Sequence, residues 1–388
     1  GVTVPAGGWC VVDQGKAAVT DEPTVLSVTD DGRQLVNRYW TLRINDEGKI
    51  LELHDRRADR PVLASGQVGN IWQVFEDRPA NHDAWDIDPT YAHRPLPGPV
   101  CQSIDVVEAG EARAAIEIVW QLPPVGDDGD RPTTTIRQRI ALYARHPRID
   151  FETEVDWHEH HQLLKVAFPV QVRATEATYE IQFGHLRRPT HRNTSWDEAR
   201  YECCGHRFVD LSEHGYGVAL LNDGKYGHDI HENVMRLTCI KSPQAPDARA
   251  DQGRHEFTYA LLPHTQTFQA AGVVRTAAER NTPVLVAPVE SSDGDLPAEH
   301  APIRVDHPAV VIDTAKPAED GQGLVLRLYE SHGSHVSATA TFAKAPDEVE
   351  VADLLEQPLT NQAAVELDGG ELKVTLRPFE VMTLRVSP

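Results

Sequence analysis

Phe151-Glu152-Thr153-Glu154-Val155-Asp156-Trp157 alternates between two kinds of side chain. Phe151, Val155 and Trp157 point one way, and the three acids point the other way. Successive side chains of a strand lie on opposite faces of a sheet, whereas a helix repeats every ~3.6 residues. The stretch is therefore predicted to be a half-buried antiparallel strand.

The same alternation recurs along most of the chain, and helical periodicity is nearly absent. Asn45-Asp46-Glu47-Gly48 predicts a hairpin turn, because glycine tolerates positive φ and Asn or Asp stabilises turns. Short helices are predicted only at 194–203 and 271–280. So many strands indicate an all-β chain whose large sheets pack face to face. Besides the first stretch, strands are predicted at 36–44, 116–120, 136–142, 166–172, 179–183, 257–262 and 324–329.

The length of 388 residues indicates more than one packed unit, because single hydrophobic cores stop growing at ~250–300 residues. A boundary is predicted within 288–302, where Ser291-Ser292-Asp293-Gly294-Asp295 and prolines interrupt the strand pattern. The residues from 309 to 388 contain about six short strands, which is enough for a small sandwich. We therefore expect a large domain over 21–300 and a small one over 301–388.

The charge of the chain limits the classes of partner that it can bind. It has 59 Asp and Glu against 37 Lys and Arg, a formal net charge of -22, which would repel nucleic acid and anionic membrane surfaces. No stretch approaches the ~20 apolar residues that would span a bilayer, and nothing at the start resembles a signal peptide. We expect a soluble protein with no nucleic-acid or membrane partner.

The 5 cysteines are sparse and show no CxxC spacing, which argues against a disulfide scaffold or a zinc ribbon. A reducing compartment is the better expectation, and we predict a cytoplasmic location. Val2-Thr3-Val4-Pro5 is typical of the middle of a strand. We therefore expect the chain to be part of a longer protein.

Residues 75–88 are predicted to form a loop in which acidic residues surround Trp85. A pyranose has an apolar face that stacks on an aromatic ring and hydroxyl groups that donate to a carboxylate. Trp85 beside Asp86 therefore fits a carbohydrate contact. The spacing leaves an alternative open, in which Trp85 fills the core and the acids cap turns.

Residues 183–197 concentrate three arginines, two histidines, an asparagine and an acid in one connection, with Arg192 and Asn193 at its centre. That is more polarity than loop solubility requires. A binding loop is one interpretation. The alternative is a network of salt bridges and hydrogen bonds that fixes a long loop against the sheet.

Residues 222–231 form a third polar connection, in which glycines allow a tight turn and Tyr226 projects from it. His228, Asp229 and His231 have side chains that bind metals. However, such a short cluster in a loop is more typical of turn residues than of a metal site.

Several longer motifs occur in one order along the chain. Together they resemble glycoside hydrolase family 38, the α-mannosidases, and more its bacterial, vacuolar and cytosolic branch than its lysosomal and Golgi branch. The resemblance runs from about Val25 to the end of the chain. The motifs are Asp83-Ala84-Trp85-Asp86, Asp156-Trp157-His158-Glu159, Leu163-Leu164-Lys165-Val166-Ala167-Phe168-Pro169, Arg188-Pro189-Thr190-His191-Arg192-Asn193-Thr194-Ser195-Trp196-Asp197, Asn222-Asp223-Gly224-Lys225-Tyr226-Gly227, and Asp251-Gln252-Gly253 before Glu256-Phe257-Thr258-Tyr259.

This resemblance implies a fold and a reaction. In the family a large antiparallel supersandwich, similar to galactose mutarotase, is followed by a small C-terminal β-sandwich, and residues 1–20 would be remnant strands of a small linking β domain. The family hydrolyses α-mannosides with retention, using two carboxylates and a zinc ion. An N-terminal α/β barrel and a helix bundle supply the nucleophile and the zinc ligands, and their motifs have no counterpart in this sequence.

We therefore expect this chain to contain no catalytic residue, no metal ligand and no cofactor, with zinc present in the full-length enzyme. Its expected partners are an α-mannoside or mannose-containing oligosaccharide and its own N-terminal barrel and bundle. The loops are expected to form one side of the sugar pocket. The rim residues implied are Trp85, Asp86, Arg192, Asn193 and Tyr226.

Two alternatives remain open for a sandwich of this kind. One is a stand-alone carbohydrate-binding module without catalysis. The other is a mutarotase-like sugar epimerase, which needs a histidine general acid and a carboxylate general base in one cleft. His191 and Asp197 are the candidates for those roles, but nothing in the sequence positions them.

Overall fold

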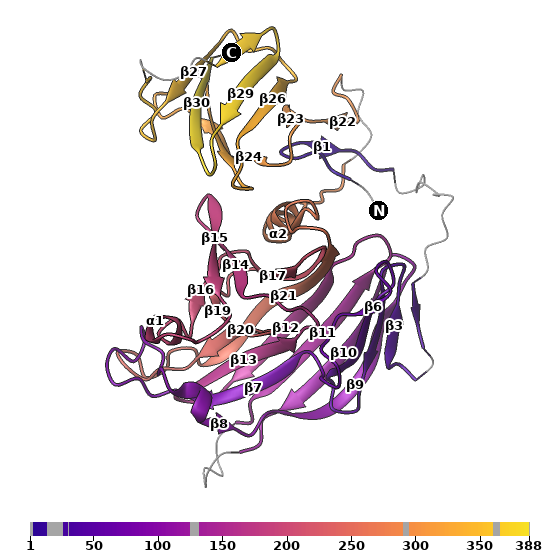
Figure 1. Ribbon diagram of the computed structural model, residues 1–388. Helices are drawn as coiled ribbons and strands as arrows, with labels where there is room; N and C mark the ends of the chain where they lie inside the picture. The colour runs from indigo at the N-terminus through magenta and orange to yellow at the C-terminus, as the bar shows by residue number, and fades with distance from the viewer. Residues whose placement is uncertain are drawn as a thin grey trace. The chain divides into compact units, whose positions relative to one another are not determined.

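Antiparallel strands make up nearly all the regular structure in the computed structural model (Figure 1). The structure describes residues 3–13, 26–29, 31–124, 132–289, 295–359 and 365–387. The chain divides into two compact units. The small unit comprises Gly1–Asp21, Ile181–His185 and Thr282–Pro388, and the large unit comprises Glu22–Glu180 and Leu186–Asn281.

The all-β sandwich fold predicted from the alternation is confirmed. The predicted domain boundaries at residues 20 and 300 stay predictions. Residues 14–25 and 290–294, which lie at or near these boundaries, are outside the described residues. The strand predicted at 151–157 lies within β12, where Phe151, Val155 and Trp157 are fully buried.

A nine-stranded sheet contains β12 between β11 and β21, with Phe151 opposite Ile140 and Tyr259. In sheet order the strands are β15 (Gly184–Pro189), β14 (Glu176–Ile181), β17 (Phe208–Glu213), β18 (Tyr216–Asn222), β21 (Gly253–Thr265), β12 (Ile149–Trp157), β11 (Thr135–Tyr143), β10 (Arg113–Gln121) and β9 (Val100–Ala109).

A six-stranded sheet belongs to the same unit, and Figure 1 shows three of its strands, β20, β13 and β7, running side by side. The main hydrophobic cluster combines residues of both sheets, for example Phe151 with Phe168. In sheet order the strands are β16 (Cys203–Cys204), β19 (Gly227–His231), β20 (Val234–Lys241), β13 (Gln162–Pro169), β7 (Ile71–Glu76) and β8 (Pro95–Leu96).

A five-stranded sheet completes the large unit and contains the predicted hairpin at 45–48. Gly48 has φ 77°, and a Cβ there would lie 2.7 Å from both Ile118 and Trp120, so only glycine fits. The strands are β2 (Ser27–Val28), β3 (Gln34–Val36), β4 (Trp40–Ile44), β5 (Ile50–Asp55) and β6 (Arg60–Pro61).

Three of the strand predictions are wrong in extent. The stretch 36–44 is broken, because the Asn37 side chain accepts hydrogen bonds from the backbone N–H groups of Tyr39 and Trp40 and bends the chain. The strand predicted at 166–172 ends at Pro169, and the one predicted at 179–183 ends at Ile181.

Helices are few among the described residues, as predicted. The helix predicted at 271–280 is present as α2 (Val273–Asn281). The one predicted at 194–203 is only α1 (Ser195–Glu198), capped by reciprocal hydrogen bonds between Thr194 and Asp197. A 3-10 turn, η1 (Tyr91–His93), lies between β7 and β8.

A closed ring of polar side chains lies inside the sandwich of the large unit. The Asn70 amide donates to Gln138 Oε1 at 2.7 Å, Gln138 donates to the Tyr259 hydroxyl at 2.8 Å, and that hydroxyl donates to Asn70 Oδ1 at 2.6 Å. All three residues are fully buried. Since each polar atom in the ring has a partner, the cost of burying it is offset.

The small unit has two four-stranded sheets around its own apolar cluster, and a two-stranded ribbon. The first sheet contains β23 (Ile303–Val305), β26 (Val336–Phe342), β29 (Glu371–Leu376) and β28 (Glu366–Asp368). The second contains β24 (Val310–Pro317), β25 (Leu324–Glu330), β30 (Val381–Ser387) and β27 (Glu348–Ala352). The ribbon pairs β1 (Trp9–Cys10) with β22 (Glu299–His300).

Candidate functional site

Two of the polar connections singled out in the sequence contribute loops that cover one face of the six-stranded sheet. Residues 184–189 and 227–231, predicted as parts of connections, are instead the strands β15 and β19. In β13, Leu164, Val166 and Phe168 enter the main core, so Lys165 and its alternate neighbours point to the opposite, outer face. Two loops cover that face: loop A, residues 77–94, and loop B, residues 190–202. Figure 1 shows η1 of loop A near β8 and α1 of loop B near β16 and β19.

Lys165 lies at the centre of the covered face and is fully buried. Its ammonium is 2.5 Å from the Glu202 carboxylate of loop B and donates to the Tyr91 hydroxyl of loop A at 3.0 Å. Burial alone would lower the pKa of Lys165, but the interactions with Glu202, Tyr91 and Asp229 together outweigh it and raise the pKa above its usual value. One buried cation therefore contacts both loops.

Asp229 extends the network along β19. It accepts a hydrogen bond from the Tyr91 hydroxyl at 3.1 Å and forms ion pairs with Arg236 at 3.2 Å and Arg192 at 3.6 Å. Burial, opposed by Lys165, raises the pKa of Tyr91 to about 12, so its hydroxyl remains a donor at neutral pH. Arg192 of loop B is thus tied to the strand beneath it.

The loops are also bonded to each other and to the chain beyond β20. The Tyr201 hydroxyl of loop B donates to the carbonyl of Ile87 in loop A at 2.8 Å. At the start of loop A, Asp77 pairs with Lys241 at 2.6 Å, and Asp83 accepts from the N–H of Gln244 at 2.7 Å. Loop A is therefore held at several points along its length.

The side chains of His228 and Asp229 lie on opposite faces of the sheet, so the two do not form a metal site. His228 is fully buried on the core side, where burial lowers its pKa to about 3. Among the residues that the structure describes, no group of three His, Cys, Asp or Glu side chains is placed to hold a metal ion. The described residues therefore do not fit a zinc site.

The predicted rim residues all lie exposed on loops around the covered face. Trp85 is 72 % exposed, which contradicts the alternative in which it fills the core, and Tyr226 is 52 % exposed. Asp86 and Asn193 are exposed too, while Arg192 combines exposure with its bond to Asp229. Loop B is thus fixed by a network and also presents polar groups to solvent, while its role as a binding loop stays a prediction.

Sequence reasoning missed two kinds of residue at this site. Trp196 on α1 is 75 % exposed, as Trp85 is on loop A, yet it was not singled out. Lys165, Glu202 and Tyr91 were missed because their partners are distant in sequence. One signal was available: Lys165 is a lone cation within the apolar run 163–168, and a buried lysine needs a partner.

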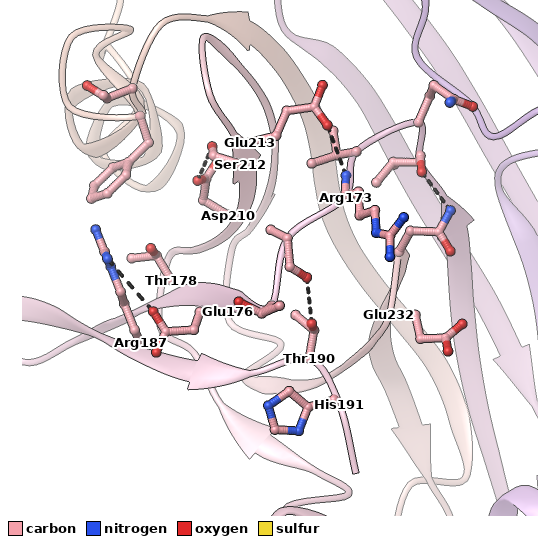
Figure 2. A pocket seen from close by; sticks show the side chains of 18 of the residues that line it. Arg173, Glu176, Thr178, Arg187, Thr190, His191, Asp210, Ser212, Glu213 and Glu232 are labelled. Carbon is pink, nitrogen blue, oxygen red and sulfur yellow. Dashed lines mark hydrogen bonds and ion pairs between the residues drawn. The ribbon is translucent and has the colours of Figure 1, made fainter. Parts of the chain in front are cut away.

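A groove of 1110 Å³ opens elsewhere in the large unit (Figure 2). Three of its four carboxylates are already engaged, Asp210 with Ser212 and His264, Glu213 with Arg60, and Glu176 with Arg187; the fourth is Glu232. None of the five predicted rim residues lines this groove. The arrangement of its charges indicates a role in holding the strands together.

His191, the candidate acid of the epimerase alternative, lines this groove, and its Nδ1 is 3.5 Å from Asp197. Asp197 itself is engaged in the capping box of α1, where it accepts from Thr194, the N-cap residue. The pair is therefore close, but the structure of the helix explains the position of its carboxylate.

No helix within the described ranges is long and apolar enough to cross a membrane.

The chain matches two family models. One, described as "Glycosyl hydrolases family 38 C-terminal domain", matches residues 35–249. The other, "Glycosyl hydrolases family 38 C-terminal beta sandwich domain", matches residues 309–384. These matches confirm the resemblance that the motifs indicated.

Relatives named as α-mannosidases align over nearly the whole chain. Alpha-mannosidase 2C1 of Homo sapiens is 40% identical over 391 residues, which cover 99% of this chain and 36% of that protein. Alpha-mannosidase G of Dictyostelium discoideum is 34% identical over 362 residues, covering 90% of this chain and 32% of that protein. The chain thus spans about a third of the length of these relatives.

A solved structure, an alpha-mannosidase from Enterococcus faecalis V583, is similar in fold. It superposes with a TM-score of 0.76 at 17% sequence identity and covers 93% of this chain and 43% of that chain. At such low identity the likeness supports the fold alone. It agrees with the all-β sandwich described above.

Proposed function

Because the chain belongs to glycosyl hydrolase family 38, as its C-terminal region, we propose that it is the β region of a retaining, zinc-dependent α-mannosidase. In this proposal it supplies a scaffold, and loops A and B with Tyr226 form one side of the sugar pocket. The substrate is an α-mannoside or a mannose-containing oligosaccharide. The nucleophile and the zinc ligands are supplied by an N-terminal barrel and helix bundle, and the enzyme is cytoplasmic.

The observation that supports this proposal is the convergence of separate loops on one covered sheet face. Loops A and B approach each other because Lys165 and the hydrogen bond from Tyr201 to Ile87 hold them. Each loop presents an exposed tryptophan, Trp85 and Trp196. Exposed indoles on a rigid support cost little entropy to bury, which suits them to a sugar face or a neighbouring domain.

Each rim residue has a distinct part in the proposal. Trp85 stacks on the apolar face of a pyranose, and Asp86 accepts hydrogen bonds from its hydroxyl groups. Arg192 and Asn193 donate to ring or glycosidic oxygens, and Tyr226 closes the side of the pocket. Arg192 has the firmest position of the five, because Asp229 holds its guanidinium.

The test is a kinetic comparison in the full-length protein. We expect Trp85→Ala and Arg192→Ala each to lower kcat/KM for an α-mannoside by about tenfold, or about 1.4 kcal/mol of transition-state binding. Their unfolding midpoints should stay near that of the parent, since Trp85 is largely exposed and Asp229 keeps its ion pair with Arg236 when Arg192 is removed. Leu355→Ala, at an 80 % exposed position of the small unit, is the matched control. Unchanged kcat/KM in both variants would reject the rim role.

A second measurement separates the proposal from a free-standing carbohydrate-binding module. Calorimetric titration of the isolated chain with mannose and mannobiose should give no measurable binding, because one side of a pocket holds a sugar poorly. The isolated chain with added zinc should also show no turnover of an α-mannoside. Binding by the chain alone would favour the module instead. The mutarotase-like alternative gains no support from the site, because Asp197 caps α1.

A further inference from the structure

The groove of the large unit contains a buried hydroxyl group that the protein leaves without a partner (Figure 2). Thr178 of β14 lines the groove and is only 7 % exposed. Its hydroxyl forms no hydrogen bond to any residue that the structure describes. Because burying an unpaired hydroxyl costs free energy, only solvent or a ligand in the groove can satisfy it.

Two charged side chains of the groove, opposite in sign, are also open to a ligand. The backbone N–H of Arg173 donates to Glu213 at 3.0 Å, and the backbone N–H of Glu232 donates to the Thr190 carbonyl at 2.7 Å. Both side chains are exposed in the groove, and within the described ranges neither is part of an ion pair. Their backbones are therefore fixed, while a guanidinium and a carboxylate remain available for binding.

The paired charges of the groove hold its walls in place. Arg60 and Glu213 form an ion pair at 2.9 Å. The buried Asp210 carboxylate accepts a hydrogen bond from Ser212 at 2.6 Å and lies 2.8 Å from Nε2 of His264, which is buried too. These bonds join β6, β17 and β21, so the groove is formed before a ligand arrives, which lowers the entropic cost of binding.

The available groups suit a neutral, polyhydroxylated ligand. A sugar hydroxyl both donates and accepts, so it can bond to a carboxylate, a guanidinium and a threonine hydroxyl alike. The net charge of -22 opposes an anionic ligand. The volume of 1110 Å³ exceeds the ~300–1,000 Å³ of most small-molecule sites, which favours an oligosaccharide over a single sugar. Phe268 lines the groove but is 4 % exposed, so it provides no ring face for stacking, and the groove alone should bind weakly.

Loop B connects the groove with the predicted rim. Its first residues, Thr190 and His191, line the groove. The next residue, Arg192, is the rim residue that pairs with Asp229 of β19. Glu232 of the groove directly follows β19 and is three residues from Asp229, about 10 Å along an extended chain. A ligand longer than one sugar unit could therefore contact both places.

We propose that the groove binds the part of a mannose-containing oligosaccharide that lies remote from the cleaved bond, through Thr178, Arg173 and Glu232. The identity of this ligand rests on the proposed function, in which the terminal mannoside occupies the rim pocket. Binding energy from a remote part of a substrate can raise kcat/KM although that part takes no role in bond cleavage. The groove therefore makes the enzyme prefer long substrates to short ones.

The test compares a long and a short substrate in the full-length protein: α-linked mannopentaose and 4-nitrophenyl α-mannoside. Thr178→Val combined with Arg173→Ala and Glu232→Gln should lower kcat/KM for mannopentaose about tenfold and leave kcat/KM for the nitrophenyl substrate unchanged. Arg275→Ala, at an exposed position of α2 in the same unit, is the matched control and should change neither value. An equal loss for both substrates, or no loss for either, would overturn the proposal.

A binding measurement without turnover separates this proposal from the rim role. Thio-linked mannopentaose, which resists hydrolysis, should bind the full-length parent about tenfold more tightly than the triple variant in a calorimetric titration. If this difference is found while Trp85→Ala and Arg192→Ala leave kcat/KM unchanged, the rim role fails and the groove stands. Equal affinity of the parent and the triple variant rejects the groove, whatever the rim variants do.

Discussion

The two faces of strand β13, within the six-stranded sheet, are equally buried but by different means. On the inner face, Leu164, Val166 and Phe168 of β13 pack into the main core. On the outer face of the same strand, Lys165 is as fully buried as they are. The inner face is covered by another sheet, whereas the outer face is covered by two loops. All eight residues of β13 are therefore buried.

The two faces therefore contribute to different properties: the stability of the sandwich and the position of the loops. The inner face contributes free energy roughly in proportion to the apolar area it removes from water. The outer face contains paired charges, whose burial often adds little net stability but whose separation is costly. We infer that the inner face holds the sandwich together, while the outer face fixes where loops A and B lie.

The largest expected effect comes from removing the buried cation. Lys165→Met leaves the Glu202 carboxylate without its cationic partner, and we expect the free energy of unfolding of the large unit to fall by about 3–5 kcal/mol. Loops A and B should loosen at the same time, so trypsin should cleave after Arg192 and Arg200 about tenfold faster. Urea unfolding and timed proteolysis measure the two effects.

Two controls accompany this variant. Arg275→Met breaks the exposed pair with Glu279, 2.7 Å apart, and should cost at most about 0.5 kcal/mol. Lys165→Met combined with Glu202→Gln removes both charges and should recover much of the loss. A single Lys165→Met variant as stable as the parent, with unchanged cleavage, would contradict the division between the two faces.

A cavity on the inner face should have nearly as large an effect on stability but none on the loops. Phe168→Ala removes a fully buried ring from the core and should cost about 3–4 kcal/mol in urea unfolding. Under native conditions, trypsin should still cleave after Arg192 at the parent rate. Faster cleavage at that site would mean that the core, rather than Lys165, positions loop B.

The pH dependence of stability tests the inner face through an effect that is smaller for each pH unit. Burial lowers the pKa of His228 from 6.5 to about 3, so between these values the unfolded chain binds a proton that the folded one does not. Stability should therefore fall as pH decreases through this window, by up to about 1.4 kcal/mol per pH unit from this group. His228→Met should reduce that slope. An unchanged slope would mean that His228 is protonated in the fold.

The smallest expected effect concerns the bond between the loops. Tyr201→Phe removes one hydrogen bond to the Ile87 carbonyl and should cost about 1 kcal/mol or less. Hydrogen exchange in residues 85–88 should increase while the unfolding midpoint barely moves. A loss as large as that of Lys165→Met would place the main support of loop A at Tyr201.

β12 could be predicted from the sequence because buried and more exposed residues alternate from Phe151 to Trp157. β13 has no such alternation, because loops cover its outer face, and its start and end were misjudged. The hairpin turn at Asn45 to Gly48 was predicted correctly from its local residue types.

Only part of the candidate site could be predicted from the sequence. Exposed residues such as Trp85 and Arg192 stand out because polar and aromatic groups gather in their loops. The bonds that support them join residues far apart in the sequence, such as Lys165 to Glu202 and Tyr91. Such pairs depend on which strands are neighbours, and composition and spacing do not specify that order.

The ring formed by Asn70, Gln138 and Tyr259 has a consequence for misfolding. A slip of β11 by one residue would turn Gln138 to the other face of its sheet and break two of the three hydrogen bonds of the ring, which leaves the amide N–H group of Asn70 without its acceptor in an apolar interior. Hydrophobic burial tolerates many arrangements of valines and leucines, but three amide and hydroxyl groups satisfy one another in one alignment only. The ring therefore destabilises mispaired sheets that would otherwise bury almost as much apolar surface as the native one.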